Sequence, residues 1–161
     1  MGLHGAAPPR RDSLMDQDDV IAILNDLIET CKDGEAGFHA CADGVSNAQL
    51  ASFFEHAAQR CTEGAAQLQA KIRELGGDPG RSGSLLGAAH RGWMNARSAI
   101  VGMDDRAILT ECERGEDYAE RAYASALKEN LPADVRSLIA KQFRVVKQNH
   151  ENVREMRNAM A

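Results

Sequence analysis

Apolar residues recur at intervals of three and four along most of this chain, and this spacing limits its fold more than any other feature. Four long segments carry it, at about 18–43, 47–75, 105–129 and 132–160. This is the spacing of a helix with one buried face. No segment alternates apolar and polar residues with the period of two that is typical of strands. The sequence therefore predicts an all-α fold.

The connections between these segments predict how the helices pair. Short turns at 43–46 and 130–133 make the helices on either side of each turn antiparallel neighbours. The connection at 76–104 is long, begins with a glycine-rich run and is helical in spacing again at about 84–101. Two helical hairpins joined by one long, partly helical crossover form a ferritin-like four-helix bundle. We therefore predict that architecture.

Length and composition limit the number of domains, the partners and the possibility of a membrane span. A chain of 161 residues suits a single domain, and we expect it over residues 17–161. Residues 1–16 have little apolar content, so we expect a disordered arm without core contacts. The net charge of −5 argues against nucleic acid as the main partner, because phosphate binding needs clustered lysine and arginine. No membrane span is expected, since no segment approaches roughly 18 consecutive apolar residues.

The cysteines indicate the cellular compartment in which the protein is expected. Cys31, Cys41, Cys61 and Cys112 form no close pair, and all lie in predicted helices. We interpret them as buried free thiols in a reducing cytosol. The start of the chain has no apolar region of the kind that a secretory signal needs. A cytoplasmic location is therefore expected.

One short motif, Cys-x-x-Gly-Glu, occurs twice, at residues 31–35 and again at residues 112–116. The Cys and the Glu of each copy are four apart and share the apolar face of a helix. The repeat predicts a duplicated hairpin in which Glu35 and Glu116 hold equivalent places and lie close together or share a partner. The glycine of each copy is expected to let two helices approach closely, because glycine inside a helix otherwise costs about 1 kcal/mol relative to alanine.

Three stretches of the chain resemble a known family. They are LNDLIETCKDGE at residues 24–35, HRGW at residues 90–93 and ECERGED at residues 111–117. These stretches resemble domain-of-unknown-function family 2383, bacterial four-helix-bundle proteins placed near the ferritin-like superfamily. The resemblance covers about residues 18–158. It implies the fold that the spacing predicts and implies no activity, because the family has no established one.

Two inward carboxylates on two helices are half of the ligand set of a di-metal centre in a ferritin-like bundle. Glu35 and Glu116 match the two single glutamates, and His150 supplies a histidine on the last helix. Lys147 stands where the acid of the Glu-x-x-His motif should be, and the second helix lacks that motif. A complete di-iron centre is not expected, since carboxylates both neutralise and bridge the metals.

Three interpretations of these residues stay open. The glutamates can belong to a polar core network, because a buried carboxylate must be paired, hydrogen-bonded or protonated. The candidate partners are His39, Tyr123, Gln142, Asn149 and His150. Alternatively, Glu35, Glu116 and His150 hold a metal ion, iron or manganese. Cys31 and Cys112 as soft ligands or as a redox pair form the third interpretation.

No motif favours an enzyme: the chain has no GxSxG and no glycine loop for phosphate. We predict a non-enzymatic, structural or stress-associated role without a cofactor, exerted through the surface. The alternative is a metal-binding or weak redox protein with a partial carboxylate and histidine site in the core. His90 and Trp93 are expected to cap the open side of the bundle. Partners are not predicted, and exposure of Phe53 and Phe143 would favour a homo-oligomer.

Overall fold

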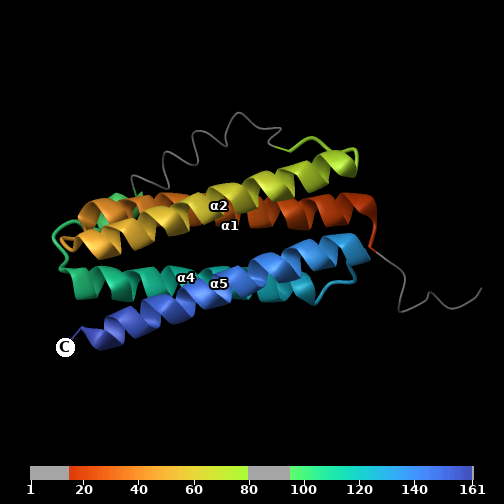
Figure 1. The fold of residues 1–161 in the computed structure, drawn as a ribbon. Coiled ribbons are helices and arrows are strands. Elements are labelled where there is room, and N and C mark those ends of the chain that lie inside the picture. Colours follow the sequence, from red (N-terminus) through yellow and green to blue (C-terminus); the bar gives the residue numbers. More distant parts are fainter. Residues whose placement is uncertain (1–14, 80–94, 161) are drawn as a thin grey trace, which may run out of the picture.

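The computed structural model describes residues 15–79 and 95–160. Four long helices make up most of that part, in the order α1 (Gln17–Gly44), α2 (Ala48–Glu74), α4 (Asp105–Leu127) and α5 (Ala133–Ala159) (Figure 1). Residues 95–100 are helical as well, and no strand occurs within the described ranges. The predicted all-α helical bundle is confirmed. The expected cap formed by His90 and Trp93 lies outside the described residues.

Contacts between helix ends show how the two hairpins are joined. Asp105, the first residue of α4, accepts hydrogen bonds from the backbone N–H groups of Ser46 (2.7 Å) and Asn47 (3.1 Å), at the turn between α1 and α2. The N–H of Met15, before α1, donates to the carbonyl of Asn130, after α4 (3.1 Å). α2 and α4 therefore run in the same direction, antiparallel to α1 (Figure 1). A long crossover between two hairpins requires this order, whereas the ferritin-like assignment stays a prediction.

Local sequence explains where the helices begin and end. Asn47 caps α2, because its side-chain oxygen accepts hydrogen bonds from two backbone N–H groups of the first turn (2.8 and 3.0 Å). Asp104 caps α4 through one such bond (2.8 Å). After α2 the chain turns at Gly76, whose φ of +81° lies in the left-handed region that glycine adopts at little cost. These helix ends agree with the turn predicted at 43–46 and with the connection predicted to begin at residue 76.

The buried core is divided into two clusters along the bundle. One cluster, where α1 and α5 begin, includes Leu24, Leu68 and Ile139. The other, where α1 ends and α4 begins, includes Phe54, Ile108 and Val153. All six side chains are fully buried, and each contributes roughly 1.5–3 kcal/mol through burial. The two clusters hold the two ends of the bundle together and leave its middle to other residues.

One described residue differs from the predicted N-terminal arm. Met15 packs against the first cluster, so the expectation that residues 1–16 make no core contact is wrong at this position. A long, unbranched thioether side chain fills an irregular gap at the end of a bundle well. Residues 1–14 lie outside the described ranges. The arm itself and the domain boundary stay predictions.

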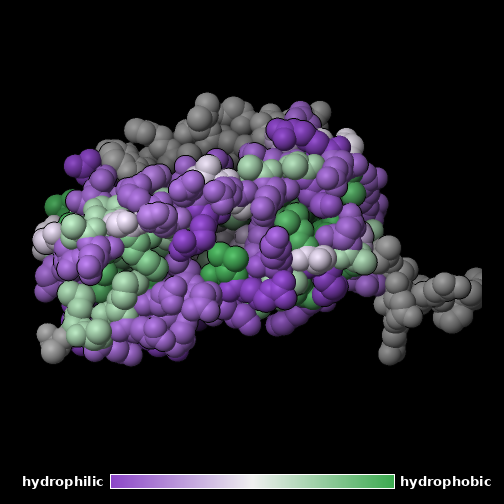
Figure 2. Space-filling model, in the orientation of Figure 1, coloured by the Kyte–Doolittle hydropathy of each residue, from purple (hydrophilic) through white to green (hydrophobic). Residues whose placement is uncertain are grey.

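The outward faces of the helices are mainly polar. Figure 2 shows one face on which hydrophilic residues dominate and hydrophobic ones form smaller patches. Phe53 and Phe143 are partly buried and pack against the two clusters, and a homo-oligomer stays a prediction. Among residues 15–79 and 95–160, no helix is long and apolar enough to cross a membrane, as the sequence predicted.

Candidate functional site

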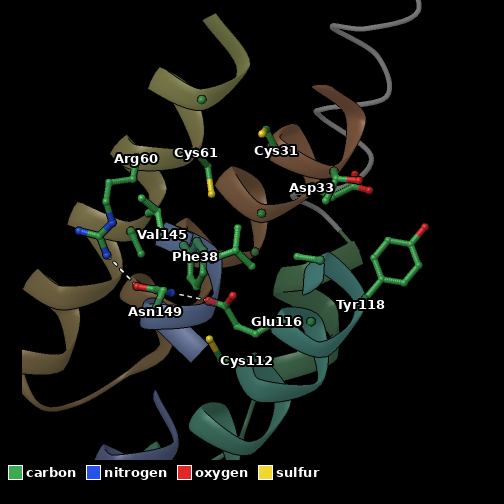
Figure 3. A pocket seen from close by; sticks show the side chains of 18 of the residues that line it. Cys31, Asp33, Phe38, Arg60, Cys61, Cys112, Glu116, Tyr118, Val145 and Asn149 are labelled. Carbon is green, nitrogen blue, oxygen red and sulfur yellow. Dashed lines mark hydrogen bonds between the residues drawn. The ribbon is translucent and has the colours of Figure 1, made fainter. Parts of the chain in front are cut away.

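A cavity of about 560 Å³ lies in the middle of the bundle, between the two core clusters. Residues of all four long helices line it, and Ala96, Ala99 and Ile100 line it as well (Figure 3). Its wall is mainly apolar. Small-molecule sites in proteins have volumes of roughly 300–1,000 Å³ and mainly apolar walls with a few polar groups. This cavity is therefore the candidate binding site of the protein.

Cysteine and glycine pairs bring α1 and α2 together beside the cavity. A Cβ atom added to Gly64 would lie 3.4 Å from Sγ of Cys31, and one added to Gly34 would lie 2.9 Å from Sγ of Cys61. Each thiol of one helix thus packs over a glycine of the other. Gly115 in the second copy of the motif lines the cavity instead, and a Cβ atom there would meet nothing within 4 Å. The expected close approach is confirmed at Gly34 and wrong at Gly115, because no residue of the described ranges approaches a Cβ atom there within 4 Å.

All four cysteines, Cys31, Cys41, Cys61 and Cys112, line this cavity as free thiols. Burial raises the pKa of Cys31 and of Cys61. A hydrogen bond with Cys41, together with burial, raises the pKa of Cys112. A thiol with a raised pKa stays protonated at neutral pH and is a poor nucleophile. The cysteines therefore serve as small wall groups, and their chemistry lends no support to the redox interpretation.

Glu116 presents a carboxyl group to the cavity, and only 5% of the residue is exposed. Its Oε1 accepts a hydrogen bond from the amide of Asn149, whose oxygen accepts one from Arg60 (2.7 Å) (Figure 3). Its Oε2 receives no hydrogen bond from the described residues. Burial raises the pKa of Glu116 to about 7, although the hydrogen bond from Asn149 opposes that rise. The cavity thus contains one carboxyl oxygen that is available to a ligand.

A second polar network forms part of the wall. The hydroxyl of Tyr123 donates to Oε1 of Gln142 (2.8 Å) and contacts Sγ of Cys31 (3.3 Å). Nε2 of Gln142 donates to the side chain of Gln67 (2.9 Å) and to the carbonyl of Gly64 (3.1 Å). Both N–H groups of this amide are used within the protein. The network therefore shapes the cavity and leaves no N–H group of Gln142 free for a ligand.

Glu35 does not occupy a place equivalent to that of Glu116. Its side chain is 27% exposed, and its Oε2 lies 3.6 Å from Nζ of Lys32. It does not line the cavity, and within the described ranges it shares no hydrogen-bond partner with Glu116. His39, an expected partner of Glu35, lies beside Glu55 instead (3.1 Å). The polar core network predicted from the sequence therefore includes Glu116 and Asn149 but not Glu35.

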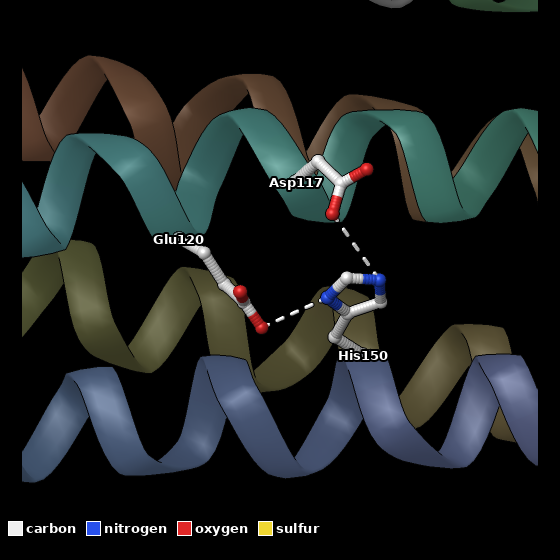
Figure 4. Close-up of side chains that lie close together, drawn as sticks. All are labelled: Asp117, Glu120 and His150. Carbon is white, nitrogen blue, oxygen red and sulfur yellow. Dashed lines mark hydrogen bonds and ion pairs between the residues drawn. The ribbon is translucent and has the colours of Figure 1, made fainter.

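His150 lies outside the cavity, buried between α4 and α5 (Figure 4). Its Nδ1 lies 2.8 Å from Oε1 of Glu120, and its Nε2 lies 3.4 Å from Oδ1 of Asp117. In the described part of the chain, these three residues form the one group of potential metal ligands whose atoms all lie within 4.8 Å of one another. Neither Glu35 nor Glu116 belongs to it. The structure thus surrounds His150 with acids other than those expected.

Sequence reasoning missed Asp117 and Glu120, although one signal was visible. Glu113, Asp117 and Glu120 recur at intervals of four and three, which places three acids on one face of α4. The ammonium group of Lys147, three residues before His150, lies over the ring of Phe143, 4.7 Å from the centroid. The acids that face His150 come from another helix, so a motif on α5 could not identify them.

Comparisons with known proteins agree with the resemblance seen in the sequence. A family model described as "Domain of unknown function (DUF2383)" matches residues 19–129. No curated protein matches the chain. The matched range covers nearly all of α1 and the whole of α2 and α4, and it ends before α5. Glu116 and Asp117 thus lie inside the matched range, whereas Asn149 and His150 lie outside it.

Proposed function

We propose a function from the site alone, because this chain belongs to the DUF2383 family, which is described as a domain of unknown function. The function is non-enzymatic: the protein binds a small, mainly apolar molecule that carries one hydrogen-bond donor, an amine or a hydroxyl group. One observation supports it most directly. Oε2 of Glu116, which receives no hydrogen bond from the described residues, belongs to a cavity of about 560 Å³ whose wall is mainly apolar.

The apolar wall accounts for the body of the ligand. Burial of a methylene group contributes roughly 0.8 kcal/mol, so each added CH₂ that fits the cavity should strengthen binding about fourfold. Cys31, Cys61 and Cys112 favour an apolar ligand body, because the raised pKa of each keeps its thiol uncharged. Carrying such a molecule is compatible with the structural or stress-associated role predicted from the sequence.

Glu116 accounts for the single polar group of the ligand. A carboxyl oxygen accepts a hydrogen bond whether the group is neutral or ionised. A ligand without a donor would displace water and leave Oε2 unpaired, which costs roughly 1–3 kcal/mol. A ligand with its own carboxylate would place a second negative charge beside Glu116 in a poorly solvated space, which is unfavourable. Amines and alcohols should therefore bind better than alkanes or fatty acids of equal length.

Calorimetric titration with straight-chain ligands of six to eight carbons tests this function. 1-Octanol and octylamine should bind with one molecule per chain, about fourfold more tightly for each added CH₂, and octanoate at least about tenfold more weakly. The double variant Gly37→Leu/Gly115→Leu should lose binding. Both glycines line the cavity, and a Cβ atom added to either meets no described residue within 4 Å, so the two leucine side chains should reduce the space for a ligand.

Arg121→Leu is the matched control, because Arg121 is exposed on α4 and does not line the cavity. It should bind the same ligands as the unmodified protein. Glu116→Leu should abolish the preference for alcohol over octanoate, since it removes the carboxyl group. Binding that is absent up to about 1 mM, or that survives in the double glycine variant, would show that the cavity does not hold such ligands.

A further inference from the structure

A second polar cluster lies between α4 and α5, outside the cavity. Glu113, Asp117 and Glu120 share one face of α4, and His150 of α5 lies against that face (Figure 4). Only 4% of His150 is exposed. The side chain of Asp117, in contrast, is 52% exposed. A buried imidazole ring thus faces three carboxylates, one of which is open to water.

The two nitrogens of the ring have different surroundings. Nδ1 lies 2.8 Å from Oε1 of Glu120, a distance at which Nδ1–H donates to the carboxylate. With the proton on Nδ1, Nε2 of a neutral ring carries a lone pair. Nε2 is buried and has no hydrogen-bond partner in the part of the chain that the structure describes. An unpaired buried nitrogen of this kind is costly unless something binds it.

The atoms nearest to Nε2 are also electron-pair donors. Oδ1 of Asp117 lies 3.4 Å from Nε2, and Oε1 of Glu113 lies 3.7 Å from it. In a tetrahedral zinc site, ligand atoms about 2.0–2.1 Å from the metal lie about 3.3–3.4 Å apart. The separation of Oδ1 of Asp117 from Nε2 matches that spacing, whereas that of Oε1 of Glu113 is wider. Nε2 of His150 and Oδ1 of Asp117 therefore lie at a separation that a metal ion could bridge with little rearrangement.

The charges around the ring favour a cation as well. Glu113 pairs with Arg157 and with Arg154, whose Nε lies 3.6 Å away, so its charge is already compensated. Asp117 and Glu120 pair with no basic side chain other than His150 among the described residues. Even a protonated ring would compensate only one of these two carboxylates. The cluster therefore has a negative charge left to balance.

From this geometry we propose that Asp117 and His150 bind a divalent transition-metal ion, with Zn²⁺ as the best fit. Nε2 of His150 and Oδ1 of Asp117 are the direct ligands. Glu120 holds Nδ1 and so orients the ring, as carboxylates commonly do for metal-binding histidines. The exposed side of Asp117 leaves room for water to complete the coordination. The bound ion would tie α4 to α5 on the side of α4 away from the ligand cavity.

Calorimetric titration of the untagged full chain with ZnCl₂ tests the site, and cobalt(II) absorption reports the coordination. One Zn²⁺ should bind per chain, and Mg²⁺ should not compete. Asp117→Asn and His150→Asn should weaken zinc binding by more than tenfold. Glu120→Gln should weaken it by about 10–100-fold, because a partner that orients a metal ligand has that effect. Glu111→Gln is the matched control, since Glu111 is an acid of α4 whose partner is Arg114 (3.6 Å).

Asp117 is half exposed, so its conversion to Asn leaves the fold intact, and circular dichroism checks this for each variant. Zinc binding that is unchanged in Asp117→Asn and His150→Asn would place the ion elsewhere, for example on the thiols, and would overturn the site. An absence of saturable zinc binding would overturn it too. The same variants are also titrated with 1-octanol. Zinc binding and octanol binding are then measured separately, so that a failure of the zinc site can be told from a failure of the cavity proposal.

Discussion

Alanine in place of the glycine of each Cys-x-x-Gly-Glu copy should change the stability in opposite directions. Gly115→Ala adds a Cβ atom that meets nothing within 4 Å. Glycine inside a helix costs about 0.5–1 kcal/mol relative to alanine, so this variant should gain that amount. For a chain of this length, such a gain corresponds to a rise in melting temperature of roughly 1–4 °C.

Gly34→Ala adds the same helix propensity but meets a neighbour. The new Cβ atom would lie 2.9 Å from Sγ of Cys61, which is closer than van der Waals contact allows. Overpacking of this kind costs roughly 1–3 kcal/mol, which exceeds the gain in helix propensity. The free energy of unfolding should therefore fall by up to about 2 kcal/mol, the difference between the two effects.

A double-mutant cycle isolates the contact. Cys61→Ala removes Sγ and leaves Cβ of residue 61 as the nearest atom, 3.9 Å from the added methyl group. In that background Gly34→Ala should stabilise the protein by about 0.5–1 kcal/mol, as Gly115→Ala does in the unmodified chain. The coupling energy between positions 34 and 61 should be about 1–3 kcal/mol. Urea denaturation followed by far-ultraviolet circular dichroism measures each corner of the cycle.

Two results would refute this reasoning. Stabilisation by Gly34→Ala in the unmodified chain would mean that α1 and α2 are not in close contact at Cys61. Destabilisation by Gly115→Ala would mean that α4 does not border open space at that position. Either result would contradict the cavity geometry on which the proposed function rests.

Three further changes have calculable outcomes. Because burial raises the pKa of Glu116 from an ordinary 4.5 to about 7, the folded state binds more protons than the unfolded chain between these values. Stability should therefore fall as the pH rises from about 4.5 to about 7, by up to roughly 3 kcal/mol, and Glu116→Gln should remove this slope in urea titrations with a chelator present. An equal slope in both proteins would show that this pH dependence of stability does not come from Glu116. Cys31, whose pKa is raised by burial, should react with iodoacetamide at least about tenfold more slowly in the folded protein than in urea, as measured by mass spectrometry of its peptide. Asn47→Ala should lower the free energy of unfolding by about 1 kcal/mol through loss of the α2 cap, whereas Asn47→Asp should leave it nearly unchanged in the same assay.

Sequence patterns predicted the four long helices, the turns between them and the order of the two hairpins. These features depend on local patterns, because apolar spacing, a capping side chain and a glycine turn act within one or two helical turns. Asn47 and Gly76 illustrate this, since each fixes a helix end through its own chemistry. The resemblance to the family agreed with the same fold.

Tertiary structure alone decided what the two motif copies do. Both present a glycine and a glutamate with the same local spacing, yet Gly34 packs under Cys61 and Gly115 faces a cavity. It also decided that His150 meets Asp117 rather than Glu116. Periodicity shows which residues share a face of one helix. Which residues of two helices meet depends on the rotation and relative height of both, and the packing of the whole bundle sets these together.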